Sequence, residues 1–372
     1  MKQLHRITLA LLLLAGQQLF GQINAHASVS SMADDNVNNN AQNLKSNVTS
    51  FMFTGGYDWE AEKTLTRLFY DGTFTYYESL LERTNHQHSV TAEFTQWYGD
   101  DDQHSIQAGG FIGTAINRDA YTLFDHSMLS VFINSKYFLS DRLINKTGYT
   151  LRSVSFSVLD DFSYTEHALF GQLAFAAVPT TTIIVQADLG SKFYSTTPSM
   201  SSASMRKGVM SSLMPSVTQT IGTVKIGQGI TDNIGISITE RYQLNLQKQT
   251  RYLSSEYGFI SDDELFDDHY GYEGLHSNAT VTALLSETTT LKVSGGIQNK
   301  LYSSLAAFDV NGNYAAGQRS DERSYLNITL LKRFDEQGIS VKGSIDRIQN
   351  SSNDALYHYN NTAVTLELGI PF

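Results

Sequence analysis

The sequence contains no cysteine and only 4 prolines among its 372 residues. Without cysteine the chain has no disulfide framework, which is what holds small secreted scaffolds together. With so few prolines, little interrupts the hydrogen-bond ladder of a β-sheet. In contrast, 20 Tyr and 20 Phe are present, and aromatic residues favour strands. The composition therefore indicates a large all-β protein.

Clustered positive charge and catalytic signatures are also lacking. The formal net charge is -11, which argues against nucleic acid as a partner because phosphate binding needs clustered Lys and Arg. The sequence holds no H-E-x-x-H, G-x-S-x-G or P-loop pattern. We therefore predict no enzyme, no cofactor, and no catalytic or metal-binding residues.

Long hydrophobic runs are absent as well. The most apolar stretch, Ile7 to Ala15, follows Lys2 and Arg6 and precedes small residues. This order is typical of a secretory signal peptide, predicted here over residues 1–27 with cleavage near Gly21 or Ala27. A membrane anchor is the alternative, although such a helix needs roughly 18 to 20 apolar residues.

Strict alternation of apolar and polar residues dominates the remainder. The chain ends on "VTLELGIPF", in which Leu366, Leu368, Ile370 and Phe372 share one face of an extended strand. The stretches "SMLSVFINSKYFL", "IIVQADLGSKFY" and "NIGISITERYQLNL" alternate in the same way. Strands this long exceed the usual five or six residues and suit a membrane-spanning barrel, whose strands need about nine to eleven.

The pair Asp71-Gly72 is normally a hairpin signal. Here the alternation continues through it, with Leu68, Tyr70 and Phe74 on one face. We therefore predict a single strand across this pair, with a hairpin as the alternative.

Connections alternate between short and long. Short polar turns are expected at Asp58 to Ala61, Gly99 to Gln103, Ser140 to Arg142, Pro179 to Thr181, Gly229 to Asp232, Ser286 to Thr288 and Asp335 to Gly338. Long loops are expected at Tyr194 to Ser212, Lys248 to Gly274 and Tyr302 to Glu322. Outer-membrane barrels have short turns on the periplasmic rim and long loops outside.

Together these features resemble the outer-membrane β-barrels of diderm bacteria, including porin-like proteins, over residues 63–372. The terminal "VTLELGIPF" resembles the assembly signal of that class, formed here by Leu366, Leu368, Ile370 and Phe372. The resemblance implies location in the bacterial outer membrane, an antiparallel transmembrane barrel, recognition by the barrel-assembly machinery, and an apolar surface in contact with outer-membrane lipid.

The predicted number of strands depends on the rule that bacterial barrels of this class have an even number. Seven short turns and a terminal strand give fifteen candidates, whereas a bacterial barrel of this class has an even number. We predict fourteen strands counted from Thr64, with sixteen as the alternative. Residues 28–62, which include the Asn-rich stretch Ala33 to Lys45, are then a polar lead-in with one possible extra strand, Val48 to Asp58.

If apolar residues face lipid, the alternate positions face the lumen. With Lys225 and Arg333, eleven cations occupy such positions against five anions, Asp71, Glu93, Asp188, Asp346 and Glu367. The lumen is thus predicted to be wet and mildly cationic, as in a passive diffusion channel for small hydrophilic solutes with a slight preference for anions. The pore-lining candidates are Arg67, Lys136, Lys146, Arg152, Lys192, Arg241, Lys292, Lys300 and Lys342.

Several alternatives stay open. The charges could pair across a closed lumen, leaving a non-conducting barrel for surface binding, adhesion or partnership with envelope proteins. Loop aromatics fit such contacts, or equally a constriction loop folded inward: Tyr252, Tyr257, Phe259, Tyr270 and Tyr272. A catalytic set on the rim is a further alternative. The acidic loop with Asp262, Asp263, Glu264, Asp267, Asp268, His269 and Glu273 is expected to be solvated rather than a Ca²⁺ site.

Overall fold

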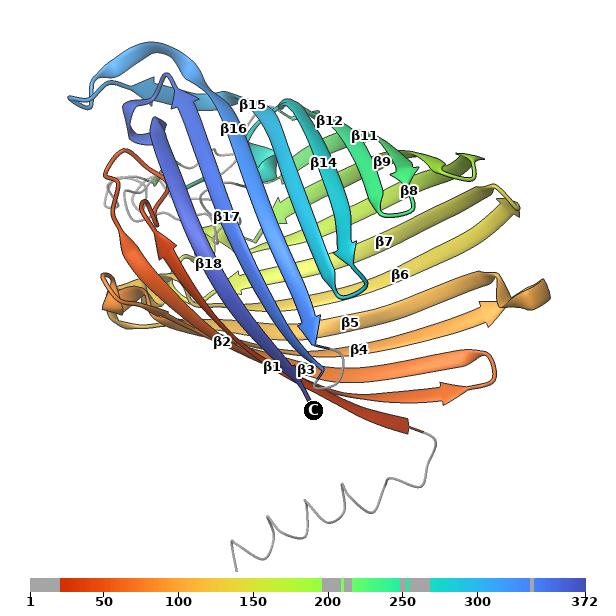
Figure 1. Cartoon of the computed structure of the whole chain (residues 1–372). Helices are drawn as coiled ribbons and strands as arrows, with labels where there is room; N and C mark the ends of the chain where they lie inside the picture. Colours follow the sequence, from red (N-terminus) through yellow and green to blue (C-terminus); the bar gives the residue numbers. More distant parts are fainter. Residues whose placement is uncertain (1–20, 196–208, 211–215, 248–251, 254–267, 335–337) are drawn as a thin grey trace, which may run out of the picture.

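The computed structural model describes residues 21–195, 209–210, 216–247, 252–253, 268–334 and 338–372. Within these residues, sixteen strands close into one antiparallel barrel (Figure 1). They are β1 (Gly21–Asp34), β2 (Ser46–Ala61), β3 (Thr64–Tyr77), β4 (Asn85–Tyr98), β5 (His104–Asn117), β6 (His126–Ser140), β7 (Leu143–Phe156), β8 (Tyr164–Val178), β9 (Thr181–Tyr194), β11 (Ser216–Thr231), β12 (Ile234–Asn245), β14 (Gly274–Ser286), β15 (Thr289–Phe308), β16 (Tyr314–Phe334), β17 (Ile339–Ser352) and β18 (Tyr359–Pro371).

Short elements lie between the barrel strands. The strands β10 (Val209–Met210) and β13 (Tyr252–Leu253) pair as a small separate ribbon. Short 3₁₀ helices are η2 (Leu81–Arg83), η3 (Asp100–Asp102), η4 (Asp119–Phe124), η5 (Asp160–Phe162), η6 (His269–Gly271) and η7 (Ala355–Tyr357). None of the helices in the described part of the chain is long or apolar enough to cross a membrane.

The predicted count of fourteen strands is wrong, and the alternative of sixteen is correct for the described residues. The two additional strands are β1 and β2, which lie before Thr64. β2 contains the stretch Val48 to Asp58, and β1 closes the barrel by pairing with β18 from His26 to Asp34. β1 escaped notice because small side chains such as Ala25, Ala27 and Ala33 occupy its outer positions, where large apolar residues give the usual signal.

Among the connections that the structure describes, two need correction, whereas the predicted loops Tyr194 to Ser212 and Lys248 to Gly274 and the predicted turn Asp335 to Gly338 lie largely outside the described residues. The predicted turn Asp58 to Ala61 is the end of β2, and the chain turns just after it. The predicted loop Tyr302 to Glu322 is mostly sheet, because β15 and β16 continue as a hairpin in which Phe308 pairs with Tyr314. The Asp71-Gly72 pair lies inside β3, which confirms the single strand.

Large apolar side chains cover the outside of the closed barrel. Exposed examples are Ile112 at 67% and Leu366 at 61% of their full accessible area. The paired backbone of a closed barrel leaves no free sheet edge, and such an apolar outer surface is unstable in water but stable in lipid. The barrel therefore spans a membrane. The C-terminal residues Leu366, Leu368, Ile370 and Phe372 are all exposed on this surface, and that they form an assembly signal stays a prediction.

The buried apolar core lies at the rim that carries the long loops, rather than halfway along the barrel. There Tyr121, Phe124, Phe162, Val217 and Tyr270 belong to one cluster, contributed by loops and strand ends. The Asn-rich stretch also packs here. Asn36 is fully buried and its Nδ2 atom donates to the carbonyl oxygens of Asn40 (2.8 Å) and Asn360 (3.0 Å). The Asn-rich stretch, expected to be part of a polar lead-in, is thus a folded loop at this rim.

Candidate functional site: an inward segment beside the lumen cavity

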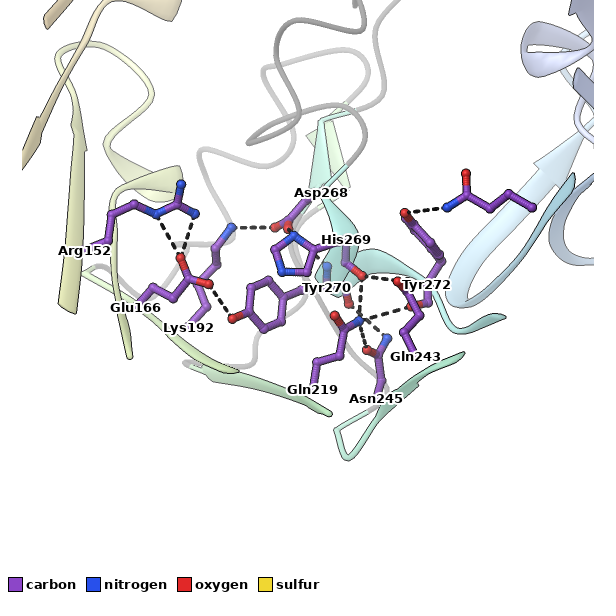
Figure 2. Close-up of polar contacts among 11 residues, drawn as sticks. Arg152, Glu166, Lys192, Gln219, Gln243, Asn245, Asp268, His269, Tyr270 and Tyr272 are labelled. Carbon is purple, nitrogen blue, oxygen red and sulfur yellow. Dashed lines mark hydrogen bonds and ion pairs between the residues drawn. The ribbon is translucent and has the colours of Figure 1, made fainter. Parts of the chain in front are cut away.

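The segment Asp268 to Glu273 enters the barrel and is held by residues of β8, β9 and β12 (Figure 2). Lys192 Nζ lies 2.6 Å from Asp268 Oδ2, and neither side chain is more than 3% exposed. The ammonium group also lies 3.9 Å from the ring centroid of Tyr164, within cation–π range. Asp268 in turn accepts a hydrogen bond from the backbone N–H of Tyr270 at 3.1 Å.

Tyr270 extends this network to β8. Its hydroxyl donates to Glu166 Oε1 at 2.5 Å, and Arg152 forms an ion pair with the other Glu166 oxygen at 2.6 Å. Burial raises the pKa of Tyr270 well above its usual range, so the phenol keeps its proton and remains a donor. The ring lies over Gly190, where a Cβ atom would collide with the phenol oxygen. Glycine at this position lets the segment approach the wall.

Side-chain amides of β11 and β12 hold the backbone of the same segment. Gln219 donates to the carbonyl oxygen of His269 at 2.6 Å, Gln243 to that of Tyr272 at 2.9 Å, and Asn245 to that of Tyr270 at 3.0 Å (Figure 2). Each such bond contributes about 1 kcal/mol, and each would be costly to leave unmade in a buried site. The amides thus fix η6 in one position.

A cavity of about 700 Å³ lies beside this segment, within the lumen. Its walls come from β7, β8, β9, β11, β12, β14, β15 and β16, with His269 and Tyr270 on the side of the inward segment. The cations Arg241 and Lys292 line it, together with His276 and Asp188. Of the loop aromatics, Tyr270 and Tyr272 are buried inside the barrel, and Tyr270 lines the cavity.

The nine pore-lining candidates all project from the face opposite the exposed apolar residues, and they differ in whether they form ion pairs. Four form ion pairs: Arg67 with Asp58, Arg152 with Glu166, Lys192 with Asp268, and Lys342 with Glu367. Within the described residues, no ion pair is found for Lys136, Lys146, Arg241 or Lys292. The last candidate, Lys300, is buried with its ammonium 4.5 Å from the Tyr272 ring. That these residues line a conduction path stays a prediction.

Two features of the site were missed from the sequence. The carboxylates Asp58 and Glu166 were not counted as lumen charges, although strand alternation puts them on inner faces. The amides Gln219, Gln243 and Asn245 also occupy inner positions of their strands, but an uncharged polar residue facing water gives no signal that it will bind a loop. Only the loop placement reveals their role.

The acidic loop is only partly described. Tyr257, Phe259, Asp262, Asp263, Glu264 and Asp267 lie outside the described residues, as do the side-chain positions of Tyr252. The carboxylate of Asp268 forms an ion pair with Lys192. In the described part of the chain, no group of three or more His, Cys, Asp or Glu side chains is arranged to hold a metal ion.

Comparison with family models and with curated protein sequences gives no match. Solved structures do match. Acinetobacter baumannii OccAB1 is similar with a TM-score of 0.56 and 8% identity, over 95% of this chain and 96% of that chain. The chain has the fold of an outer-membrane porin.

Two Pseudomonas aeruginosa structures are similar as well. OccK8 (OprE) gives a TM-score of 0.53 at 10% identity, over 95% of this chain and 98% of that chain. OpdK, solved with vanillate, gives 0.50 at 11% identity, over 94% of this chain and 98% of that chain. At such identities the likeness concerns the fold, and the chemistry of the lumen must be argued from this chain.

Proposed function

We propose that this protein is a passive diffusion channel of the bacterial outer membrane for small hydrophilic solutes, with a modest preference for anions. The observation that carries the proposal is the lumen cavity beside the inward segment, lined by Arg241 and Lys292. A charged lumen is hard to dehydrate, so water and small solutes should fill it.

The anion preference rests on the pairing of the lumen charges. Cations that form ion pairs contribute little net field, whereas Lys136, Lys146, Arg241 and Lys292 have no ion-pair partner among the described residues. Lys136 and Lys146 are moreover directly opposite each other on β6 and β7. Like charges in such a position repel, and an anion between them relieves the repulsion.

The porin fold supports transport over the alternative of a non-conducting barrel for surface binding. The inward position of Tyr270 and Tyr272 also supports transport. Both side chains are buried inside the barrel, so they are not exposed for contact with a surface partner. Small solutes, lipid and the barrel-assembly machinery are the partners that this function implies.

The test is the reversal potential of the purified protein in a planar bilayer under a salt gradient. Replacing Arg241 and Lys292 together with Gln should shift it toward cation preference, because both line the cavity and neither is used to hold the inward segment. The matched control is Lys63→Gln at the periplasmic turn, where the ion pair with Asp102 is half exposed. An unchanged potential in the Arg241/Lys292 variant would show that these residues do not line the conduction path.

A further inference from the structure

Two histidines and a tyrosine form a cluster on the outer wall of the barrel. His86 and His88 are two positions apart on β4, so both side chains project from the same face of the strand. That face is the outer one, because His86 pairs in register with Phe74 of β3 and Ile116 of β5, which are both exposed. Tyr70 of β3 shares the outer face with Phe74. The cluster therefore plays no part in the lumen.

The polar atoms of the cluster converge. His86 Nδ1 lies 2.9 Å from His88 Nε2, with the two imidazole rings inclined at 66°. The other ring nitrogen of His88, Nδ1, lies 2.6 Å from the hydroxyl oxygen of Tyr70. Both nitrogens of His88 are thus engaged, one by the phenol and one by the second histidine.

Gly72 makes room for this arrangement. It lies opposite His88 in register, and the Tyr70 ring crosses it, so that a Cβ atom at Gly72 would lie 2.5 Å from the phenol oxygen. The Asp71-Gly72 pair resembles a hairpin signal, yet it lies within β3. Its glycine serves the contact between Tyr70 and His88.

The two facing imidazole nitrogens have the spacing of ligands on a divalent copper ion. Metal–imidazole bonds are about 2.0 to 2.1 Å long, and two such bonds at a right angle hold their nitrogens about 2.9 Å apart. A right angle is the tetragonal geometry of Cu²⁺, whereas the tetrahedral angle of Zn²⁺ requires about 3.3 Å. The 2.9 Å between His86 and His88 therefore suits Cu²⁺, which also binds imidazole more tightly than Zn²⁺ does.

Tyr70 determines which nitrogen of His88 is available to a metal. A neutral imidazole carries one proton, and the hydrogen bond made by one nitrogen sets the tautomer. When Nδ1–H of His88 donates to the Tyr70 oxygen, Nε2 keeps the lone pair that faces His86. Such a hydrogen bond orients a metal-binding histidine and raises its affinity.

The cluster is also accessible to ions from outside. β4 has 14 residues, and His86 is the second of them, at the rim that carries the long loops. At about 3.3 Å per residue and a tilt of about 40°, such a strand rises about 35 Å, whereas the apolar band of a barrel is about 25 Å tall. His86 therefore lies at the level of the lipid headgroups, and its side chain is half-buried rather than buried.

A second pair on the outer wall provides an internal comparison. Tyr149 of β7 and His167 of β8 form a hydrogen bond of the same length, 2.6 Å. Two positions before His167 stands Thr165, so this pair lacks a second imidazole. The Tyr–His hydrogen bond thus occurs twice on this wall, and only the pair on β3 and β4 adds another histidine.

We propose that His86 and His88 form a Cu²⁺ site at the outer surface of the membrane, with Tyr70 as a positioning residue and water in the remaining coordination positions. The site has two protein ligands, fewer than the groups of three that the described part of the chain lacks. It requires the barrel fold only, and it holds whether or not the lumen conducts.

Copper titration of the purified barrel, without an affinity tag, tests the site. With CuCl₂ as the probe, we expect a single tight Cu²⁺ whose electron paramagnetic resonance spectrum shows coupling to two imidazole nitrogens. H86Q and H88Q should each lower the affinity by about tenfold or more and remove the two-nitrogen coupling, because one ligand is lost. H167Q is the matched control and should bind Cu²⁺ as the wild type does.

The Tyr70 contact provides a second arm. Y70F keeps both imidazoles, so it should retain the two-nitrogen spectrum while lowering the affinity about tenfold. G72A should have the same effect, because the added carbon displaces the phenol oxygen. Equal copper affinity and equal spectra in the wild type and in folded, heat-modifiable H86Q and H88Q barrels overturn the proposal. Binding of Zn²⁺ as tight as that of Cu²⁺ overturns it as well.

Discussion

Lys192 Nζ lies 2.6 Å from Asp268 Oδ2, although 76 positions separate the two residues in the chain. This buried ion pair connects β9 to the segment that narrows the lumen. Removing one partner of a buried pair typically costs 3 to 5 kcal/mol, because the remaining charge is left without compensation. The pair is therefore expected to decide whether the segment stays in the lumen.

We predict that Lys192→Met and Asp268→Leu each release the segment and raise single-channel conductance. The double variant should return toward wild type, because apolar residues of similar volume can replace a buried pair. Conductance and protease accessibility of the segment provide the readout. Equal conductance in the wild type and both single variants would show that the ion pair does not hold the constriction.

Gly190→Ala should act on the same segment by a different route. A Cβ atom at this position collides with the hydroxyl of Tyr270, so the phenol can no longer donate to Glu166. We expect a larger conductance with a normally folded barrel. Gly222→Ala, where nothing lies within 4 Å of the added carbon, is the matched control and should leave conductance unchanged.

The lipid and lumen faces can be tested by introducing charge. Arg at Ile236, an exposed outer residue of β12, should destabilise the barrel by roughly 2 to 4 kcal/mol. Arg at Thr239, which lines the lumen cavity on the same strand, should cost much less. Equilibrium unfolding in urea from lipid vesicles measures both, and equal costs would mean that the two faces are assigned wrongly.

The mature chain is expected to begin at Gln22 rather than at Ser28. Residues Gln22 to Ala27 pair with Phe53 to Asp58 of β2, and cleavage after Ala27 would leave those backbone groups of β2 without partners. Residues 1–20 lie outside the described residues, so the signal peptide itself stays a prediction. The intact mass of protein from outer membranes distinguishes the two sites; a mass that begins at Ser28 would rule out the full length of β1.

Assembly depends on the end of the chain. Phe372 is exposed at 76%, and its backbone N–H donates to the carbonyl oxygen of Ala25 at 2.8 Å, next to the closure of the barrel. Phe372→Asp should leave unassembled protein in the periplasm, whereas Phe334→Asp, at an exposed phenylalanine on β16, should assemble. Normal abundance of heat-modifiable Phe372→Asp protein in the outer membrane would argue against the terminal signal.

The barrel could be predicted from sequence because alternation is a local property of each strand. It identified the strand through Asp71-Gly72 and the outer face of β12. The predicted number of strands was too low in part because several outer residues of β1 are small and give only a weak alternation signal. The Asn-rich loop was misjudged because its order comes from specific partners distant in sequence, such as Asn36 with Asn360. The inward segment likewise depends on amides whose partners only the fold brings together.

Single-channel recording of the purified wild-type protein tests the central claim most directly. The account predicts discrete conductance steps in a planar bilayer, with a reversal potential in a salt gradient that shows modest anion preference, because Arg241 and Lys292 line the lumen cavity. Absence of conductance from folded, membrane-inserted protein would contradict the channel and favour a closed barrel.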